Sequence, residues 1–116
     1  LNKQYPHIPV ICFPKGAGWL LPEFVQSVGP QAISLDAQTP LERIVAEIPS
    51  SCVIQGNLDP ALLIAGGKKL LQGVEDILSI MAARPHIFNL GHGIDKETTP
   101  ENVAHLVAAI RQNNTL

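Results

Sequence analysis

The sequence predicts an α/β protein built from four βα units. Four short apolar runs, rich in β-branched residues and bounded by proline, glycine or polar residues, are typical of buried strands. Apolar residues after each run recur at the spacing of one helix face. Because continuous apolar strands alternate with helices, the sheet is expected to be parallel and covered by helices. Four such units make either a small open α/β sheet or half of a (β/α)8 barrel, since a complete barrel takes about 250 residues and the chain has 116.

The first unit begins with a strand over residues 10–13, an apolar run with a proline on each side. A loop over residues 15–18 leads into a helix over residues 19–28, which carries a proline in its first turn, where that residue is tolerated. Gly29 and Pro30 end this helix, because glycine favours the left-handed conformation after a helix and proline cannot continue it.

The second unit has a strand over residues 32–36 followed by a helix with a clear start signal. Thr39 is predicted to be the N-cap, with Pro40 as the first helical residue and Glu42 as the reciprocal partner of a capping box. Pro49 ends the helix. Its apolar face is expected to consist of Leu41, Ile44, Val45 and Ile48.

The third unit has a strand over residues 52–55. Asp59 and Pro60 are typical of an N-cap and a first-turn residue, so a short helix is expected to start there. Gly66 and Gly67 break it, and a longer helix follows. The apolar stripe of the longer helix is Leu70, Val74, Ile77, Leu78 and Met81.

The fourth unit has a strand over residues 86–90. The last helix is entered through the Thr-Pro-Glu segment at residues 99–101, which combines a cap with a proline in the first turn. Its apolar stripe is Val103, Leu106, Val107 and Ile110.

Composition and charge narrow the class of protein. The net charge of −2 offers no basic surface for nucleic acid or for an anionic membrane, and no apolar run approaches the roughly 18 residues of a membrane span. Cys12 and Cys52 each lie in an apolar run, which favours reduced core cysteines of a cytoplasmic protein over a disulfide or a metal site. The chain begins with Leu and enters a strand almost at once, so we expect residues 1–116 to be a fragment of a longer protein.

Ligands of parallel α/β proteins bind beyond the carboxyl ends of the strands. Four segments are predicted to lie there: residues 15–18, Asp36, residues 55–60 and residues 89–94. The last segment is the most suggestive, because Gly91 and Gly93 let the backbone turn and leave His92 uncrowded. His92 could donate a hydrogen bond to a carboxylate or transfer a proton, or it could merely hold its own turn.

The neighbouring polar residues have two interpretations each. Gln55 and Asn57 could line a pocket or satisfy backbone groups at the strand end, and Asn57 suits the second role. Asp36 could line the site or bind its own loop, and Asp59 suits a helix cap better than an acid. Residues 15–18 lack the spacing of a nucleotide-binding loop, and no cluster has the spacing of zinc ligands. Surface or capping roles are expected for the other histidines, His7, His86 and His105.

Several segments together resemble the uroporphyrinogen decarboxylase family in order and spacing, over essentially the whole chain. They are Ile-Pro-Val-Ile at residues 8–11, Gly-Ala-Gly at 16–18, Ser-Leu-Asp at 34–36, Gln-Gly-Asn-Leu-Asp-Pro at 55–60 and Phe-Asn-Leu-Gly-His-Gly-Ile at 88–94. The resemblance implies that residues 1–116 are the C-terminal half, the last four βα units, of a (β/α)8 barrel, with the N-terminal half absent.

The resemblance also implies an activity. Members of the family convert uroporphyrinogen III to coproporphyrinogen III in haem biosynthesis by removing the carboxyl groups of four acetate side chains, without a metal or an organic cofactor, as homodimers. His92 matches the substrate-contacting histidine of the Gly-His-Gly motif. The family's arginine-rich motif, pyrrole-binding aspartate, tyrosine and serine lie in the absent part, so we expect these residues alone to be inactive. Arg43, Arg84 and Arg111 are expected on helices or at their ends, away from the strand ends.

Two other classes of protein remain as alternatives. Zinc-dependent corrinoid or thiol methyltransferases share the superfamily, but they bind zinc through a His-x-Cys pair that this sequence lacks. A non-catalytic α/β binding module made of four units is the other alternative. Half of a barrel would expose strand edges and apolar faces, so the isolated chain is expected to be a poor monomer.

Overall fold

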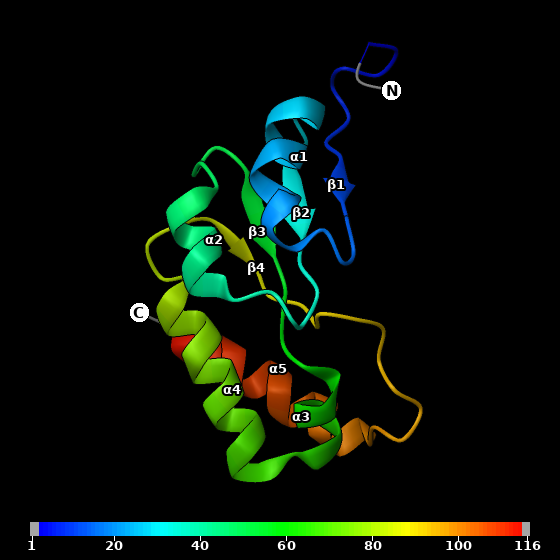
Figure 1. Cartoon of the computed structure of the whole chain (residues 1–116). Coiled ribbons are helices and arrows are strands. Elements are labelled where there is room, and N and C mark those ends of the chain that lie inside the picture. The colour runs from blue at the N-terminus through cyan, green and yellow to red at the C-terminus, as the bar shows by residue number, and fades with distance from the viewer. Residues whose placement is uncertain (1–2, 115–116) are drawn as a thin grey trace.

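The structure, a computed structural model, describes residues 3–114. Its centre is a four-stranded sheet in which every neighbouring pair is parallel, in the order β1-β2-β3-β4 (Figure 1). The strands are β1 (Ile11–Cys12), β2 (Ala32–Ser34), β3 (Val53–Gln55) and β4 (His86–Ile87). The helices are η1 (Gly18–Leu20), α1 (Leu21–Val28), α2 (Leu41–Glu47), α3 (Pro60–Ala65), α4 (Gly67–Ile80) and α5 (Pro100–Asn114). The four βα units predicted from the sequence are confirmed.

The strands are shorter than predicted, and in β2 and β4 the residues are lost where the carboxyl end leaves the regular ladder for loop partners. After β2, Leu35 still donates its N–H to the Gln55 carbonyl at 2.9 Å, but the chain then turns at Asp36. After β4, parallel pairing resumes only as an isolated bridge between Leu58 and Leu90. The predicted strand over residues 86–90 is therefore regular only in its first two residues.

The start of α2 differs from the prediction, whereas the start of α3 agrees with it. Pro40 is the N-cap of α2 and forms no side-chain cap bond, so the predicted capping box is wrong. The Thr39 hydroxyl instead donates to Oδ1 of Asp36 at 2.9 Å, a partner within the preceding turn. Asp59 caps α3 as expected, with its Oδ1 accepting the Ala61 N–H at 2.9 Å.

The helix faces pack as their periodicity predicts, with two exceptions. Leu70, Val74, Ile77 and Met81 of the α4 stripe are buried. Val45 and Val107, predicted on the apolar faces of α2 and α5, are 38% and 39% exposed. Both lie at the margin of their stripes. The most deeply buried large side chains are Leu21, Ile33, Leu35, Ile44, Ile54, Leu58, Leu63, Leu70 and Val74.

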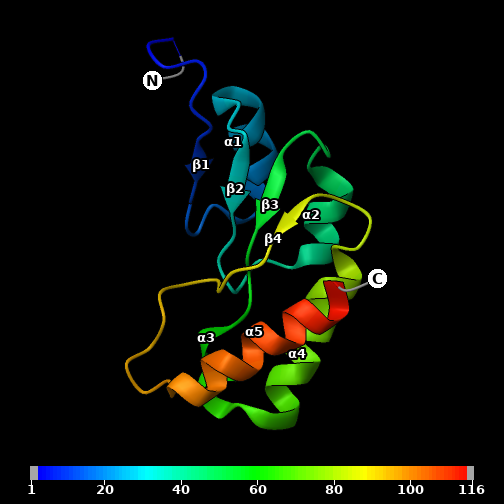
Figure 2. The same cartoon turned by 180° about the vertical axis from the view of Figure 1, so that it is seen from behind.

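The two faces of the sheet have different surroundings. α1 and α2 lie against one face (Figure 1), and the view from behind shows the strands in front of these helices (Figure 2). Ile33 pairs with Ile54 on the helix side, and both are fully buried. Ile11 and Ile87 occupy the alternate strand positions and are 50% and 43% exposed. Side chains of successive strand residues point to opposite faces, so the face opposite the helices presents uncovered apolar groups.

Among the described residues, no helix is both long enough and apolar enough to cross a membrane.

Candidate functional site

A hollow of about 630 Å³ lies at the carboxyl ends of the strands. Its floor is apolar, from Ile11 and Phe13, and its polar wall comes from Ser34 and Gln55. The segment from Asn89 to Ile94, which includes His92, completes the lining. Gln55 Nε2 donates to Ser34 Oγ at 3.1 Å, so the two polar side chains of neighbouring strands hold each other in place.

His92 is exposed at the rim of this hollow and meets Lys15 from the loop after β1. The Lys15 Nζ lies 3.3 Å from His92 Nε2. A lysine ammonium can only donate, so a hydrogen bond at this contact requires Nε2 as the acceptor and the ring proton on Nδ1. In that tautomer His92 has one hydrogen bond to donate, from Nδ1.

The turn over residues 36–39 supports the loop that carries Lys15. Asp36 accepts hydrogen bonds from the Gly16 N–H at 2.9 Å and from the Gln38 N–H at 3.1 Å, in addition to the Thr39 hydroxyl. Partial burial raises the pKa of Asp36, but the hydrogen bonds from Gly16, Thr39 and Gln38 favour the carboxylate and hold the pKa below its ordinary value. Asp36 thus ties the Lys15 loop to the turn.

Asn57 holds the same turn from inside the protein. Its Nδ2 donates to the carbonyl oxygens of Asp36 and Thr39, both at 2.8 Å, and its side chain is buried. Gly56 precedes it with a φ of +117°, in the region that favours glycine. A Cβ at Gly56 would also lie 2.9 Å from the Leu35 carbonyl oxygen.

The two glycines that flank His92 have different roles. A Cβ on Gly91 would lie 2.3 Å from the backbone nitrogen of Ala37, so this glycine lets the His92 loop pack directly on the 36–39 turn. A Cβ on Gly93 would meet nothing within 4 Å. Neither glycine has a positive φ. The space around Gly91 is therefore used by the protein backbone itself.

The structure separates the predicted site residues into two groups. Gln55, Gly91, His92 and Gly93 line the hollow. Asp36 and Asn57, for which pocket lining was one alternative, do not line it, because their polar groups are engaged in holding the 36–39 turn. Their second interpretation, binding backbone groups, agrees with these contacts.

Sequence reasoning missed Lys15 and Ser34 as members of this region. The signal for Lys15 was its place directly after the first predicted strand, where ligand-side residues are found. The sequence analysis predicts residues 15–18 at the ligand side of the sheet, but it assigns no contact to Lys15. Ser34 is the last residue of β2, opposite Gln55 in the register, and that pairing is a property of the assembled sheet.

A larger hollow of about 750 Å³ lies on the helix side, between α4, β4 and α5. Its lining includes Arg84, His86 and Phe88. The His86 Nε2 donates to the Gly56 carbonyl oxygen at 2.6 Å. Burial lowers the pKa of His86, and this hydrogen bond opposes the effect. This hollow is away from the carboxyl ends of the strands, so we place the functional site at the smaller one.

The remaining candidate groups lie elsewhere in the molecule. His7 and His105 are exposed, as expected, whereas His86 is half-buried. Cys12 and Cys52 are free, and burial raises the pKa of the Cys52 thiol. Residues 3–114 contain no group of three His, Cys, Asp or Glu side chains arranged to hold a metal ion.

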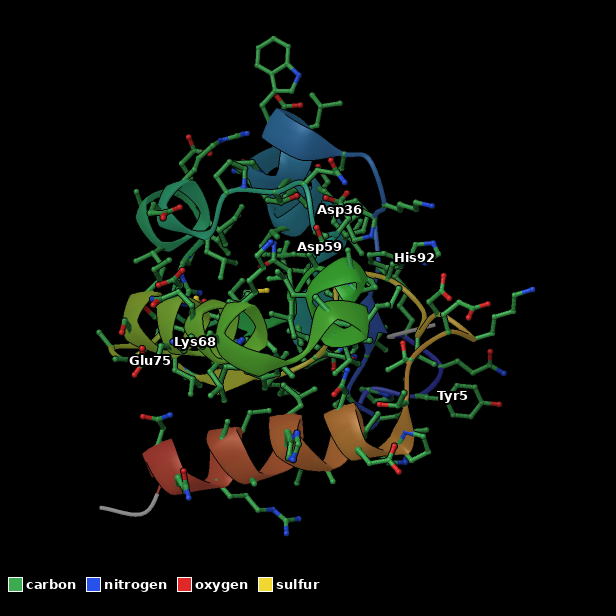
Figure 3. All side chains as sticks on the ribbon, turned by 90° about the horizontal axis from the view of Figure 1, so that it is seen from below. Tyr5, Asp36, Asp59, Lys68, Glu75 and His92 are labelled. Atoms are coloured by element: carbon green, nitrogen blue, oxygen red, sulfur yellow. The ribbon has the colours of Figure 1, made fainter. Side chains whose placement is uncertain are left out.

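The arginines lie away from the hollow, as predicted. Arg43 pairs with Glu47 at 2.9 Å on the outer side of α2, and Arg111 is in the last turn of α5. Arg84 donates to carbonyl oxygens near the amino end of β3. Asp36, Asp59 and His92, labelled in Figure 3, follow β2, β3 and β4 and so lie beyond the carboxyl ends of these strands.

Comparison with known proteins identifies the family. A family model described as uroporphyrinogen decarboxylase matches residues 1–113. The chain belongs to the uroporphyrinogen decarboxylase family. Its parallel strands and alternating helices are those of part of this family's (β/α)8 barrel, which confirms the predicted fold class.

Curated relatives support the assignment. Proteins named uroporphyrinogen decarboxylase are similar to this chain in Rhodospirillum rubrum (45% identical over 111 residues), Chelativorans sp. (46% over 115) and Rickettsia bellii (45% over 112). The alignments cover 96–97% of this chain but only 32–33% of each relative. The chain therefore spans about a third of the length of these uroporphyrinogen decarboxylases.

Proposed function

We propose that this chain forms part of a uroporphyrinogen decarboxylase, which removes the carboxyl groups of the four acetate side chains of uroporphyrinogen III to give coproporphyrinogen III. The observation that carries the proposal is the position of His92. It is in the Gly-His-Gly segment by which the sequence resembles the family, within the residues that the family model matches, and it is at the rim of the hollow at the carboxyl ends of the strands. That edge is where barrel enzymes carry their active sites.

The shape and chemistry of the hollow suit such a substrate. Its apolar floor, from Ile11 and Phe13, can contact the flat face of a tetrapyrrole. Its polar wall and the Nδ1–H of His92 can contact the carboxylates at the edge of the macrocycle. A donor already in place at a carboxylate stabilises charge without reorganisation during the reaction.

The reaction needs no external electron acceptor. Protonation of a pyrrole ring makes the ring the electron sink, the C–C bond to the carboxylate breaks, and carbon dioxide leaves. The resulting exocyclic carbon then takes up a proton and the ring releases its own. Each acetate thus consumes one proton and becomes a methyl group. Within this scheme His92 binds and orients substrate, and the remaining groups come from the part of the enzyme outside this chain.

We also propose that residues 1–116 are the C-terminal four βα units of the barrel. The exposed apolar side chain of Ile87, which is on the uncovered face of the sheet and outside the hollow, supports this proposal, because a closed barrel would bury it in its interior. The roughly two thirds of each relative that lies outside the alignment provides the chain for the other units. The same proposal includes a homodimeric, cytoplasmic enzyme of haem biosynthesis that uses no metal.

The test is the decarboxylation of uroporphyrinogen III by the full-length protein, followed by separation of the porphyrins after oxidation. We expect the full-length protein to form coproporphyrinogen and the 116-residue chain alone to form none. His92→Ala should lower the rate by about 10- to 100-fold, the range for loss of a hydrogen bond to a charged group, with an unchanged melting temperature.

His105→Ala is the matched control, because this histidine is exposed on α5 and outside the hollow. It should behave as the unaltered enzyme. A full-length protein that leaves uroporphyrinogen untouched would contradict the proposed function. An active enzyme in which His92→Ala has no effect would contradict the role of His92 alone.

A further inference from the structure

We propose that Lys15 is a positioning residue for His92: its ammonium group holds Nε2 and so keeps the imidazole as the tautomer with its proton on Nδ1. The direct evidence is the 3.3 Å contact between Lys15 Nζ and His92 Nε2. The two residues are 77 positions apart in the chain, so the contact is made by the fold and not by local sequence.

The contact is built by the loops on either side of it. Gly16, next to Lys15, donates its N–H to Asp36, and Gly91, next to His92, packs on the backbone of Ala37. Both loops are therefore held on the 36–39 turn. The residue that makes each of these contacts is adjacent in sequence to Lys15 or to His92. Asn57 fixes that turn through two buried hydrogen bonds.

The ammonium group of Lys15 has no carboxylate partner among residues 3–114 and can therefore bind His92. Within residues 3–114 the structure records one ion pair, between Arg43 and Glu47, so Lys15 is not paired with a carboxylate of that range. The carboxylate of Asp36, which lies in the neighbouring turn, is occupied by the Gly16 and Gln38 N–H groups and by the Thr39 hydroxyl.

A fixed tautomer decides what His92 can do. The two nitrogens of an imidazole have distinct roles, and the bond made by one sets whether the other is a donor or an acceptor. With Nε2 occupied by Lys15, Nδ1–H is the donor that remains for substrate. His92 then acts as a neutral hydrogen-bond donor to a carboxylate of the tetrapyrrole and not as a general base. The binding of a tetrapyrrole carboxylate by His92 rests on the proposed function, whereas the tautomer that Lys15 imposes on His92 does not.

The experiment compares the full-length protein with its Lys15→Met, Lys15→Arg and Lys69→Met variants. Nitrogen-15 NMR of labelled histidine reports which ring nitrogen of His92 carries the proton. Steady-state kinetics with uroporphyrinogen III gives kcat and KM. Lys69→Met is the matched control, because it removes the same charge from an exposed position on α4.

We expect the unaltered protein to show His92 with the proton on Nδ1. Lys15→Met should move the proton population toward Nε2 and lower kcat by about 10- to 100-fold, the range for loss of a hydrogen bond to a charged group, with a smaller change in KM. Lys15→Arg, which keeps a cationic donor, should restore the tautomer and most of kcat. Lys69→Met should change neither.

The tautomer and the activity separate the two proposals. If Lys15→Met leaves the tautomer of His92 unchanged, or if the unaltered protein carries the proton on Nε2, the role of Lys15 is wrong whatever the activity. If the full-length protein is inactive on uroporphyrinogen but its tautomer responds to Lys15→Met, the proposed function is wrong and the positioning by Lys15 stands. Because Lys15 is exposed, an unchanged melting temperature is expected for every variant.

Discussion

At each end of the parallel sheet a polar side chain donates to backbone carbonyls, but the two ends differ in which polar side chains remain exposed. At the amino end, the guanidinium of Arg84 donates to three carbonyl oxygens, at 2.8 to 2.9 Å. These carbonyls belong to Ile48, Pro49 and Cys52. At the carboxyl end, the buried amide of Asn57 donates to two carbonyls of the 36–39 turn.

The two ends differ in how their cationic side chains are used. At the amino end the cationic Arg84 donates its hydrogen bonds to backbone carbonyls and stabilises the fold. At the carboxyl end the buried amide of Asn57 and the carboxylate of Asp36 hold the turn, and the cationic Lys15 and the imidazole of His92 stay exposed beside a hollow. This division matches the general pattern of parallel barrels, in which the amino ends of the strands contribute stability and the carboxyl ends contribute chemistry.

Gly91→Ala should have the largest effect on the carboxyl end. The added methyl would lie 2.3 Å from the Ala37 nitrogen, so the His92 loop must move away from the 36–39 turn. We expect a loss of about 3 kcal/mol in the free energy of unfolding, at the upper end of ordinary overpacking, and a loss of activity because His92 is displaced. Urea unfolding of the full-length protein measures the first effect.

Gly93→Ala is the control for this change, because its methyl would meet nothing within 4 Å. Its free energy of unfolding should stay within about 0.5 kcal/mol of the original, as for other surface changes. Equal destabilisation by the two alanines would show that the contact with Ala37 does not govern the loop.

Arg84→Met tests the amino end of the sheet. It keeps most of the side-chain length but leaves three carbonyls without their donor, so we expect a loss of about 2 kcal/mol in the free energy of unfolding. Turnover per folded molecule should be unchanged, because Arg84 binds carbonyl oxygens near the amino end of β3 and does not line the hollow that includes His92. Arg43→Met, which removes the ion pair with Glu47 on the surface of α2, should lower the free energy of unfolding by only about 0.5 kcal/mol. A large fall in kcat for Arg84→Met would mean that the two ends are not separate.

Asp36→Ala should have a smaller effect than Gly91→Ala and Arg84→Met, with a distinctive pH dependence. The folded-state pKa of Asp36 is lowered from 3.8, so its carboxylate stabilises the fold fully above that value and loses this contribution as the pH falls through the folded value. At pH 7 we expect the variant to be less stable by about 1 kcal/mol, the scale of one net hydrogen bond. Unfolding curves measured between pH 7 and pH 3 should show this difference shrinking. A difference that is constant or grows toward acid would contradict the role of the ionised carboxylate.

The sequence by itself determined the parts of the protein that depend on local order. The apolar runs predicted where the strands lie, the 3.6-residue spacing predicted the buried stripe of α4, and Asp59 was recognised as a cap. The motif around His92 also pointed to the correct family, and His92 was correctly placed beyond the carboxyl ends of the strands. These features depend on residues within a few positions of one another, where backbone geometry and spacing are enough.

The tertiary structure alone decided which polar groups face the hollow and which hold the protein together. The predicted role of Thr39 as the N-cap of α2 is wrong, because its hydroxyl binds the nearby carboxylate of Asp36 and not the end of the helix. The roles of Asp36 and Asn57 were left open, and Lys15 was passed over, because each depends on a contact with a loop at least 18 residues away. Spacing along the chain predicts which edge of a sheet a residue reaches, but the hydrogen bond it makes there depends on which loops the assembled sheet brings beside it.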